Sequence, residues 1–351
     1  MSKISIDNIL YTNNIEQDIK KYLEGNNYSK IFIIVDQNTK KYCLPIIINA
    51  FDNVNIIEIK NGDENKSINT AIYIWNYLTE NKADRKSLII NLGGGVICDL
   101  GGFVASTFKR GIKFINIPTT LLSQVDASIG GKTGINFNSL KNEIGTFYFP
   151  DFVFIDAVFL KTIDKQNFLS GFAEIIKHSL IFDISYWNNI KNIDIENIDY
   201  QVLNSIILNS INTKKHFVET DPLEQGIRKA LNFGHTFGHA FESLSYIQNR
   251  PILHGYAVAY GIVCETYLSV LKLKFNYNDY IQISDFIYKL YGKFSLNIDN
   301  FELVYNLLLH DKKNSNNQIK LTLIQEKGKF NINNLILKDE IIETLTRYLN
   351  N

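Results

Sequence analysis

The chain has 351 residues, of which 45% are apolar and 21% are charged, as in an ordinary globular protein long enough for two domains. Its formal net charge is zero and it has no run of about 18 apolar residues, so we expect no nucleic-acid partner and no membrane partner. Three scattered cysteines and an amino terminus without a signal-peptide pattern predict a reducing, cytoplasmic location.

The first half of the chain alternates short apolar runs with helical patterns. We expect buried strands at 31–35, 55–59, 87–92, 113–117 and near 152, and an amphipathic helix at 67–81. This alternation predicts an α/β domain with a Rossmann-like, largely parallel sheet over residues 1–160. Ligands of such sheets bind beyond the carboxyl ends of the strands. Asp36 follows the first strand, and its carboxylate could accept hydrogen bonds from a ribose. On sequence alone, a helix N-cap or turn is the simpler interpretation.

A glycine-rich stretch follows the run at 87–92. Gly93–Gly95 carry no Cβ, so the backbone can turn sharply there and a ligand can approach it closely. The apolar segment at 103–108 is expected to begin a helix, and a helix start behind a glycine turn suits an anion or a nucleotide phosphate. A plain tight turn explains the three glycines equally well. Lys132 ends a sequence similar to a P-loop, but Asp126 replaces its first glycine, which disfavours a nucleoside triphosphatase.

From about residue 161 the pattern becomes helical. We expect helices at 168–190, 201–219, 228–245 and 256–273, and a β-hairpin at 319–332 around a Lys-Gly pair. These patterns predict a second, mainly α-helical domain over residues 161–351. Because no flexible linker separates the two halves, we expect the active site in the cleft between the domains.

The second half also contains candidate metal ligands. His235 and His239 are four residues apart on an expected helix and therefore share a face, a spacing that can bind zinc. No glutamate lies between them, which argues against a metalloprotease. Glu174 on an earlier helix and His254 in a loop or at a helix start complete a donor set that suits catalytic Zn²⁺. The sequence alone does not choose among the six histidines, and Glu174 with His178 is a rival helical pair.

The motifs around these residues resemble those of the 3-dehydroquinate synthase family. The resemblance rests on the Arg110-Gly111 pair and on six segments: GGGVICDLGGFVAST (93–107), PTTLLSQVDASIGGKTGIN (118–136), KNEIGTFYFP (141–150), GFAEIIK (171–177), LNFGHTFGHAFE (231–242) and LHGYAVAYG (253–261). It implies a carbon–oxygen lyase that converts 3-deoxy-D-arabino-heptulosonate 7-phosphate to 3-dehydroquinate and phosphate. The implied steps are transient NAD-dependent oxidation, β-elimination of phosphate, reduction, ring opening and intramolecular aldol closure.

The resemblance also implies the cofactor sites. It assigns Zn²⁺, which Co²⁺ can replace, to Glu174, His235 and His254, and gives His239 a substrate contact instead. The implied NAD positions follow strands or lie in nearby loops: Asp36, Asn38, Asn61, Gly62, Asp63, Glu64, Asn65, Lys66, Gly95, Val96, Ile97, Cys98, Asp99, Thr119, Thr120, Lys132, Lys141, Phe159, Leu160, Lys161 and Thr162. The segment GDENK at 62–66 departs from the family's GExxK, which leaves the acidic contact there open.

The implied substrate carries a phosphate and a carboxylate, which cationic side chains hold. The positions that the resemblance implies for it are Asp126, Lys132, Asn142, Lys177, Lys214, Arg228, Asn232, His239 and Lys312 or Lys313. Arg110 is implied to reach the phosphate bound by the neighbouring subunit. The resemblance therefore also implies a homodimer.

Two other classes of enzyme remain open. A related sugar-phosphate cyclase, such as a valiolone or deoxy-inosose synthase, would share the fold, NAD and metal, but Asn232 and the basic residues around Arg228 favour a carboxylate-bearing substrate. An NAD-dependent polyol dehydrogenase of the glycerol dehydrogenase type would release NADH stoichiometrically. It needs no phosphate clamp, so Lys132, Lys141 and Arg110 argue against it.

Overall fold

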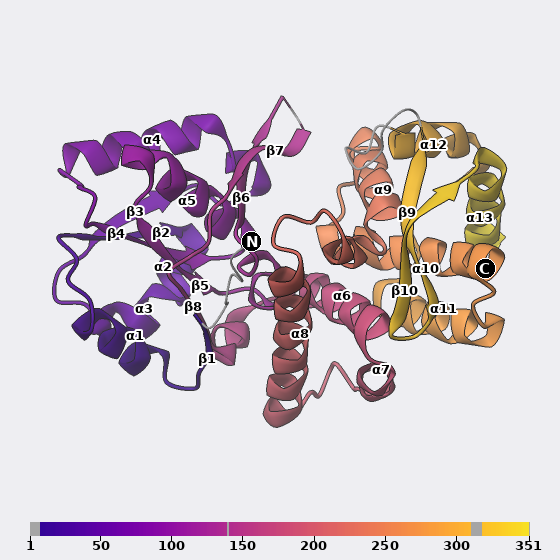
Figure 1. The fold of residues 1–351 in the computed structure, drawn as a ribbon, viewed down its shortest axis with the longest axis horizontal. Helices are drawn as coiled ribbons and strands as arrows, with labels where there is room; N and C mark the ends of the chain where they lie inside the picture. Colours follow the sequence, from indigo (N-terminus) through magenta and orange to yellow (C-terminus); the bar gives the residue numbers. More distant parts are fainter. Residues whose placement is uncertain (1–7, 139, 310–317, 351) are drawn as a thin grey trace. The chain divides into compact units, whose positions relative to one another are not determined.

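The computed structural model describes residues 8–138, 140–309 and 318–350, and the chain divides into two compact units after Asp164. The sequence patterns place the domain boundary after residue 160. Figure 1 shows the helices and strands of each unit. Across the residues so described, no helix is both long and apolar enough to pass through a lipid bilayer.

The first unit contains a six-stranded parallel sheet. Its strands, in spatial order, are β1 (Ile9–Tyr11), β8 (Phe152–Ile155), β5 (Lys113–Pro118), β4 (Leu88–Gly93), β2 (Ile31–Asp36) and β3 (Asn55–Ile59). Every neighbouring pair is parallel. The inner strands are almost wholly apolar, because a sheet covered on both faces buries both sets of side chains. The predicted Rossmann-like sheet is confirmed, with β1 added at one edge.

Helices cover both faces of this sheet (Figure 1). The helices of the first unit are α1 (Ile15–Glu24), α2 (Gln37–Tyr42), α3 (Leu44–Ile47), α4 (Ile68–Glu80) and α5 (Gly95–Thr107). Phe32 and Ile34 of β2 share one hydrophobic core with α4 and α5, whereas Ile33 and Val35 share a second core with α1 and α3. Alternate residues of a strand point to opposite faces, so a single buried strand contributes to both cores.

The helix after the glycine turn begins earlier than predicted. α5 begins at Gly95, whereas the sequence placed the start of a helix near residue 103. Glycines lower the helix propensity of these first turns, but tertiary packing requires them. A Cβ on Gly101 would overlap the side-chain amide of Asn91 on β4, so only glycine lets α5 lie this close to the sheet.

A two-stranded antiparallel ribbon was not predicted from the sequence. β6 (Lys132–Phe137) pairs with β7 (Leu140–Phe147), and most side chains of β7 are exposed. The ribbon carries Lys132, Lys141 and Asn142, which the sequence analysis assigns to the cofactor and the substrate. Lys132 is therefore the first residue of a strand and not the end of a P-loop.

The second unit is mainly helical, as predicted. Its elements are α6 (Lys165–Phe182), α7 (Ile184–Ile190), α8 (Tyr200–Thr220), the 3-10 helix η6 (Ile227–Asn232), α9 (His235–Ile247), α10 (His254–Leu273), α11 (Tyr277–Tyr291), the 3-10 helix η7 (Ile298–Asn300), α12 (Phe301–Leu309), β9 (Ile319–Glu326), β10 (Lys329–Ile336) and α13 (Lys338–Asn350). α10 packs against α6, α9, α11, α13 and β9 (Figure 1). Most of its residues are buried, as in a helix that is apolar on all sides. The predicted hairpin is formed by β9 and β10, and Gly328 has a φ of +86° in its turn.

Two predicted helix boundaries in this unit are wrong. The helix expected at 168–190 is interrupted at Asp183, whose carboxylate accepts a hydrogen bond from the backbone N–H of Ser185 and begins α7. The helix expected at 228–245 begins at His235, because Gly234 before it has a left-handed φ of +80°. Residues Ile227–Asn232 form a 3-10 helix instead.

Candidate functional site

The carboxyl ends of the parallel strands bring most of the predicted NAD positions to one edge of the sheet. Asp36 of β2 lies in register with Ile59 of β3, and Gly93 of β4 lies in register with Pro118 of β5. The segments that follow these strands therefore leave the sheet at the same edge, where parallel sheets bind their ligands. They include Asn38, the loop at 61–66, the glycine turn, and Thr119 with Thr120. Phe159–Thr162 follow β8 within a 3-10 helix, η5 (Ala157–Thr162).

The glycine turn leads directly into α5. Gly94 is the N-cap residue, and Gly95, Val96 and Ile97 form the first turn. The first backbone N–H groups of a helix have no acceptor within it, so they offer donors to an anion. A Cβ on Gly94 would lie 3.1 Å from Cγ2 of Thr120, so the backbone here packs closely against the segment after β5. Cys98 lies in the next turn and is buried.

Asp36 caps a helix, as the sequence alone favoured. Its Oδ1 accepts a hydrogen bond from the backbone N–H of Thr39 at 2.7 Å, and Oγ1 of Thr39 accepts one from the backbone N–H of Asp36 at 2.9 Å. An ionised carboxylate has several acceptor positions, so this cap leaves capacity for a ribose hydroxyl. Asn61 lies beside this helix, since its backbone N–H donates to Oε1 of Gln37 at 2.8 Å.

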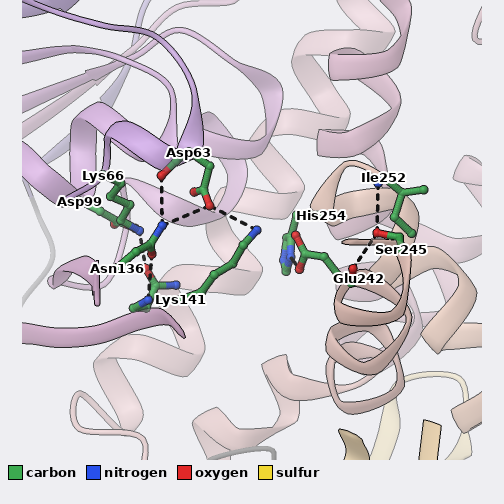
Figure 2. A network of polar contacts seen from close by, with 10 residues as sticks. Asp63, Lys66, Asp99, Asn136, Lys141, Glu242, Ser245, Ile252 and His254 are labelled. Atoms are coloured by element: carbon green, nitrogen blue, oxygen red, sulfur yellow. Dashed lines mark hydrogen bonds and ion pairs between the residues drawn. The ribbon is translucent and has the colours of Figure 1, made fainter. Parts of the chain in front are cut away.

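Lys66 connects three of the predicted site segments of the first unit. Only 4% of its surface is exposed, and its Nζ donates to Oδ2 of Asp99 at 2.5 Å (Figure 2). The same Nζ donates to Oδ1 of Asn142. Burial raises the pKa of Asp99, while the ammonium of Lys66 opposes that shift. The loop at 61–66, α5 and the β6–β7 ribbon are therefore held together by one buried cation.

Asp63 forms a second connection between the loop at 61–66 and the ribbon. Nδ2 of Asn136 donates to the carbonyl oxygen and to Oδ2 of Asp63, at 3.1 Å in each case (Figure 2). Nζ of Lys141 lies 3.4 Å from the same carboxylate oxygen. Asp63, one of the two acidic residues in the GDENK segment, is thus engaged by the protein itself.

Three further predicted residues of the first unit are Asp126, Lys132 and Arg110. Asp126 is partly buried in a π-helical turn, Ser123–Ala127, and Lys132 is exposed at the start of β6. Arg110 is exposed at the end of a 3-10 helix, Phe108–Arg110, and has a φ of +66°. Residues other than glycine seldom adopt this left-handed conformation, so the local backbone is strained where Arg110 projects.

Glu174, His235 and His254 come together within the second unit. Their ligand atoms all lie within 4.8 Å of one another. Nε2 of His235 is 3.5 Å from Oε1 of Glu174, and Nε2 of His254 is 3.9 Å from the same oxygen. Tetrahedral zinc with bonds of about 2.0–2.1 Å separates neighbouring ligand atoms by about 3.4 Å. The donor set and these two separations are therefore close to those of a zinc site.

The burial of Glu174 supports the same conclusion. Its side chain has no exposed surface, and it forms an ion pair with Lys177 one turn further along α6. An ionised carboxylate removed from water requires positive charge close to it. Lys177 supplies one such charge, and a divalent cation at the three ligands would supply another.

Helix packing at glycines brings the ligand-bearing segments together. A Cβ on Gly261 of α10 would overlap the carbonyl oxygen of Gly234, the residue just before α9. A Cβ on Gly255 would overlap the backbone of Ser170, which lies one turn before Glu174 on α6. Only residues without a Cβ allow these close approaches. The two histidines of this group are the first residues of α9 and α10, so the same contacts fix their backbones.

Two other histidines lie nearby in the same unit. His239 shares a face of α9 with His235, and their ring centres are 5.7 Å apart, which confirms the predicted helical spacing. The ring centre of His239 is 5.9 Å from that of His254. His178, the rival partner of Glu174 on α6, is fully buried with Nδ1 2.6 Å from Oγ of Ser210.

Three of the basic residues assigned to the substrate are buried in the second unit: Lys177, Lys214 and Arg228. Such residues are rarely buried without a specific partner. Nη1 of Arg228 donates to the carbonyl oxygen of Pro222 at 2.6 Å, and its backbone N–H donates to Oδ2 of Asp221 at 3.1 Å. Burial of these cations favours a structural or ligand-binding role over that of solvated surface charges.

The remaining predicted substrate residues are Asn232 and a lysine near the carboxyl terminus. Nδ2 of Asn232 donates to Oε1 of Glu224 at 2.8 Å, and Glu224 has a φ of +58°. Lys312 and Lys313 lie outside the residues that the structure describes.

Comparison with known proteins identifies the family. Residues 56–170 match the 3-dehydroquinate synthase N-terminal family, and residues 171–314 match the 3-dehydroquinate synthase C-terminal family. The chain is 46% identical over 347 residues to a 3-dehydroquinate synthase of Parabacteroides distasonis, with 98% of each chain covered. The chain belongs to the 3-dehydroquinate synthase family.

Two solved structures of other synthases share the fold of this chain. One is ValA, a 2-epi-5-epi-valiolone synthase from Streptomyces hygroscopicus subsp. jinggangensis 5008, which was solved with NAD⁺ and Zn²⁺. Its alignment with this chain has a TM-score of 0.85 and 20% identity, and it covers all of this chain and 98% of the ValA chain. The other is a 2-deoxy-scyllo-inosose synthase that was solved with NAD⁺ and Co²⁺. Its alignment has a TM-score of 0.83 and 22% identity, and it covers 97% of this chain and 96% of the synthase chain. At these identities the likeness concerns the fold alone.

The sequence analysis did not single out three polar residues that contact predicted site positions: Asn136, Glu224 and Glu242. Oε2 of Glu242 lies 3.4 Å from Nδ1 of His254. One signal was available, because Glu242 lies two helical turns after His235 and so falls on the same face of the predicted helix. No local pattern distinguishes Asn136 or Glu224.

Proposed function

We propose that this protein converts 3-deoxy-D-arabino-heptulosonate 7-phosphate to 3-dehydroquinate and inorganic phosphate. The observation that carries the proposal is the grouping of Glu174, His235 and His254, whose buried carboxylate and two imidazoles have the spacing of zinc ligands. The 46% identity to a 3-dehydroquinate synthase along nearly the whole chain supports this reaction over that of a sister cyclase.

The two cofactors are assigned to different units of the chain. NAD is assigned to the edge of the sheet where Asp36, the loop at 61–66, the start of α5 and Thr119–Thr120 lie. The metal is assigned to the three ligands of the second unit. When bound, NAD accepts and returns a hydride, and the metal acts as a Lewis acid toward substrate oxygen atoms.

The side chains of the protein hold the substrate and move its protons. Lys177, Lys214 and Arg228 provide positive charge for its phosphate and carboxylate, and the guanidinium of an arginine can bind either group through two parallel hydrogen bonds. His239 and Asn142 are assigned to orienting or relaying protons at the reacting hydroxyl. Asp126, Lys132, Asn232 and Lys312 are assigned further substrate contacts.

The proposal extends to the assembly and location of the enzyme. We propose that the protein is a homodimer in which Arg110 reaches the substrate phosphate of the neighbouring subunit. The exposed position of Arg110 on a strained bend supports this role. The protein is placed in the cytoplasm, which is supported by its three cysteines, all buried and free of disulfides.

The experiment that tests the proposal measures phosphate release from the heptulosonate phosphate. The purified protein is assayed with catalytic NAD⁺, after chelation of metal, and after Zn²⁺ is restored. We expect phosphate release that requires both cofactors and leaves no net NADH. Activity only on a heptulose phosphate lacking the carboxylate would reassign the protein to the sister cyclases. Net NADH formation from a polyol would overturn the cyclase reaction altogether.

A further inference from the structure

We infer that Glu242 is a positioning residue of the metal site, whose carboxylate orients the ring of His254 so that Nε2 faces Glu174. This inference rests on the proposed function, because it takes Glu174, His235 and His254 as the metal ligands. It adds a fourth residue that acts on the metal through a ligand and does not touch the metal itself.

The first step of the argument is the geometry of the His254 ring. Nδ1 of His254 lies 3.4 Å from Oε2 of Glu242, and Nε2 of the same ring lies 3.9 Å from Oε1 of Glu174. The imidazole therefore has a carboxylate at each of its two nitrogens. Figure 2 shows the Glu242 side chain, which is only 5% exposed, reaching the His254 ring from α9. The two residues belong to consecutive helices, α9 and α10.

The second step is the chemistry of this contact. An ionised carboxylate accepts hydrogen bonds and cannot donate them, so Nδ1 of His254 is the donor toward Glu242. A neutral imidazole that carries its hydrogen on Nδ1 has its lone pair on Nε2, the atom that faces Glu174. A carboxylate behind a ligating histidine fixes the tautomer and the ring orientation and strengthens the metal bond.

The other histidine ligand supports this assignment independently. Nδ1 of His235 lies 3.3 Å from the carbonyl oxygen of Phe233, so that ring also has an acceptor at Nδ1. Its Nε2 again faces Glu174 at 3.5 Å. Both histidines therefore have Nδ1 engaged by the protein and Nε2 directed at the same carboxylate oxygen.

Glu242 is itself fixed to the segment that leads to His254. Its carbonyl oxygen accepts a hydrogen bond from Oγ of Ser245 at 2.6 Å, and the same Oγ accepts one from the backbone N–H of Ile252 at 3.3 Å (Figure 2). These contacts use backbone atoms of Glu242, so they survive replacement of its side chain. A variant at this position therefore removes the carboxylate while leaving the link between α9 and the chain before His254.

Zinc affinity of the full-length protein, measured by competition with a chromogenic chelator, tests the inference. The second readout is the visible absorption spectrum of the Co²⁺ form, which reports ligand geometry without any assay of activity. In Glu242→Ala we expect zinc affinity to fall by roughly 10- to 100-fold and the Co²⁺ bands to shift. Glu242→Gln should recover part of this affinity, because its amide oxygen still accepts a hydrogen bond from Nδ1.

Asp279→Asn provides the matched control. The carboxylate of Asp279 pairs with Lys327 at 2.6 Å in the same unit, so this variant replaces a paired carboxylate with an amide at a different place. It should leave both metal readouts unchanged. An equal loss of affinity in the control would mean general destabilisation and would overturn the inference.

The remaining outcomes separate this inference from the proposed function. Wild-type zinc affinity and an unchanged Co²⁺ spectrum in Glu242→Ala would refute the role of Glu242 while the metal site stands. Failure of the wild-type protein to bind zinc stoichiometrically would refute the metal site and, with it, this inference. Phosphate release that persists without metal would refute the metal-dependent mechanism but not the contact between Glu242 and His254.

Discussion

The carboxylate of Glu174 and the ammonium of Lys177 form an ion pair with almost no exposed surface. Glu174→Gln removes the only anionic metal ligand proposed, so we expect it to abolish zinc binding and phosphate release. It also removes the carboxylate of the buried ion pair with Lys177, which should cost about 3–5 kcal/mol of unfolding free energy. Metal analysis of the dialysed protein and guanidinium unfolding measure the two effects.

A double variant separates the two roles of Glu174. Glu174→Gln combined with Lys177→Met removes both charges, and replacing a whole buried pair by uncharged groups is often nearly neutral. We therefore expect the double variant to regain stability but not zinc. Recovery of zinc binding in the double variant would contradict the assignment of Glu174 as a ligand.

The cysteines provide a prediction about pH. Burial raises the pKa of the Cys43 thiol from its ordinary value of 9.0 to about 11, and it also raises the pKa of Cys98 and Cys264. The thiolate is the reactive form, so at neutral pH the native protein should react with a thiol reagent far more slowly than the unfolded chain. Rapid labelling of native protein at neutral pH would contradict this account.

The same shift predicts how Cys43 affects stability. Its pKa is higher in the folded state than in the unfolded state, so its contribution to stability is complete below pH 9 and is lost as the pH rises through about 11. Cys43→Ser should flatten this alkaline loss, because a serine hydroxyl does not titrate in that range. Guanidinium unfolding of both proteins at several alkaline pH values measures the difference.

At the scale of elements, the close packing of α9 and α10 should be sensitive to substitution. Gly261→Ala would place a Cβ against the carbonyl oxygen of Gly234, and forcing the two segments apart should cost about 3 kcal/mol. We also expect weaker zinc binding, since His235 and His254 begin these helices. Guanidinium unfolding and chelator competition measure the two effects.

Gly25→Ala is the control for this prediction. Gly25 follows α1 with an ordinary φ of −79°, and an added Cβ would come no closer than 3.6 Å to other atoms. We expect its effect on stability to stay within about 1 kcal/mol. Equal effects of the two substitutions would show that crowding between α9 and α10 is not the cause.

The sequence predicted the buried strands well, for a physical reason. Strands covered on both faces need continuous apolar runs, and the expected runs at 31–35 and 113–117 agree with β2 and β5 to within one residue. β1 has only three residues and β7 is largely exposed, so neither leaves such a run. The start of α5 was missed because Gly95, Gly101 and Gly102 lower its helix propensity, and only tertiary packing explains them.

The candidate site could be predicted only in part. Helical spacing placed His235 and His239 on one face, and strand ends placed Asp36 at the ligand-binding edge. The selection of His254 depends on how α10 packs beside α9, which no local pattern encodes, and it came from the family resemblance. Glu242 was missed because a glutamate at that spacing is usually a solvated surface charge.

At the scale of the whole molecule, the proposed role of Arg110 in a neighbouring subunit makes a prediction about mixtures. Arg110→Ala and His235→Ala should each be inactive alone. If Arg110 acts across subunits, a mixed dimer contains one complete site, and random exchange in an equal mixture should restore about a quarter of wild-type activity. Phosphate release before and after subunit exchange measures this recovery.

A second combination controls for the mixing itself. Glu174→Ala and His235→Ala both remove proposed metal ligands of the same site, so no mixed dimer of these two variants contains a complete one. We expect no recovery from this pair. Absence of recovery with Arg110→Ala as well would place Arg110 in the site of its own subunit or outside any site.

The three proposed metal ligands are far apart in the chain, because α7, α8 and η6 lie between Glu174 and the two histidines. An unfolded second unit therefore has no ready-made site, and we expect zinc to bind the native state far more tightly. Mass action then adds about 2.7 kcal/mol of stability when free zinc is a hundredfold above its dissociation constant. We expect zinc starvation to shorten the lifetime of the protein against proteases as well as to stop its chemistry, which limited proteolysis with and without zinc would reveal.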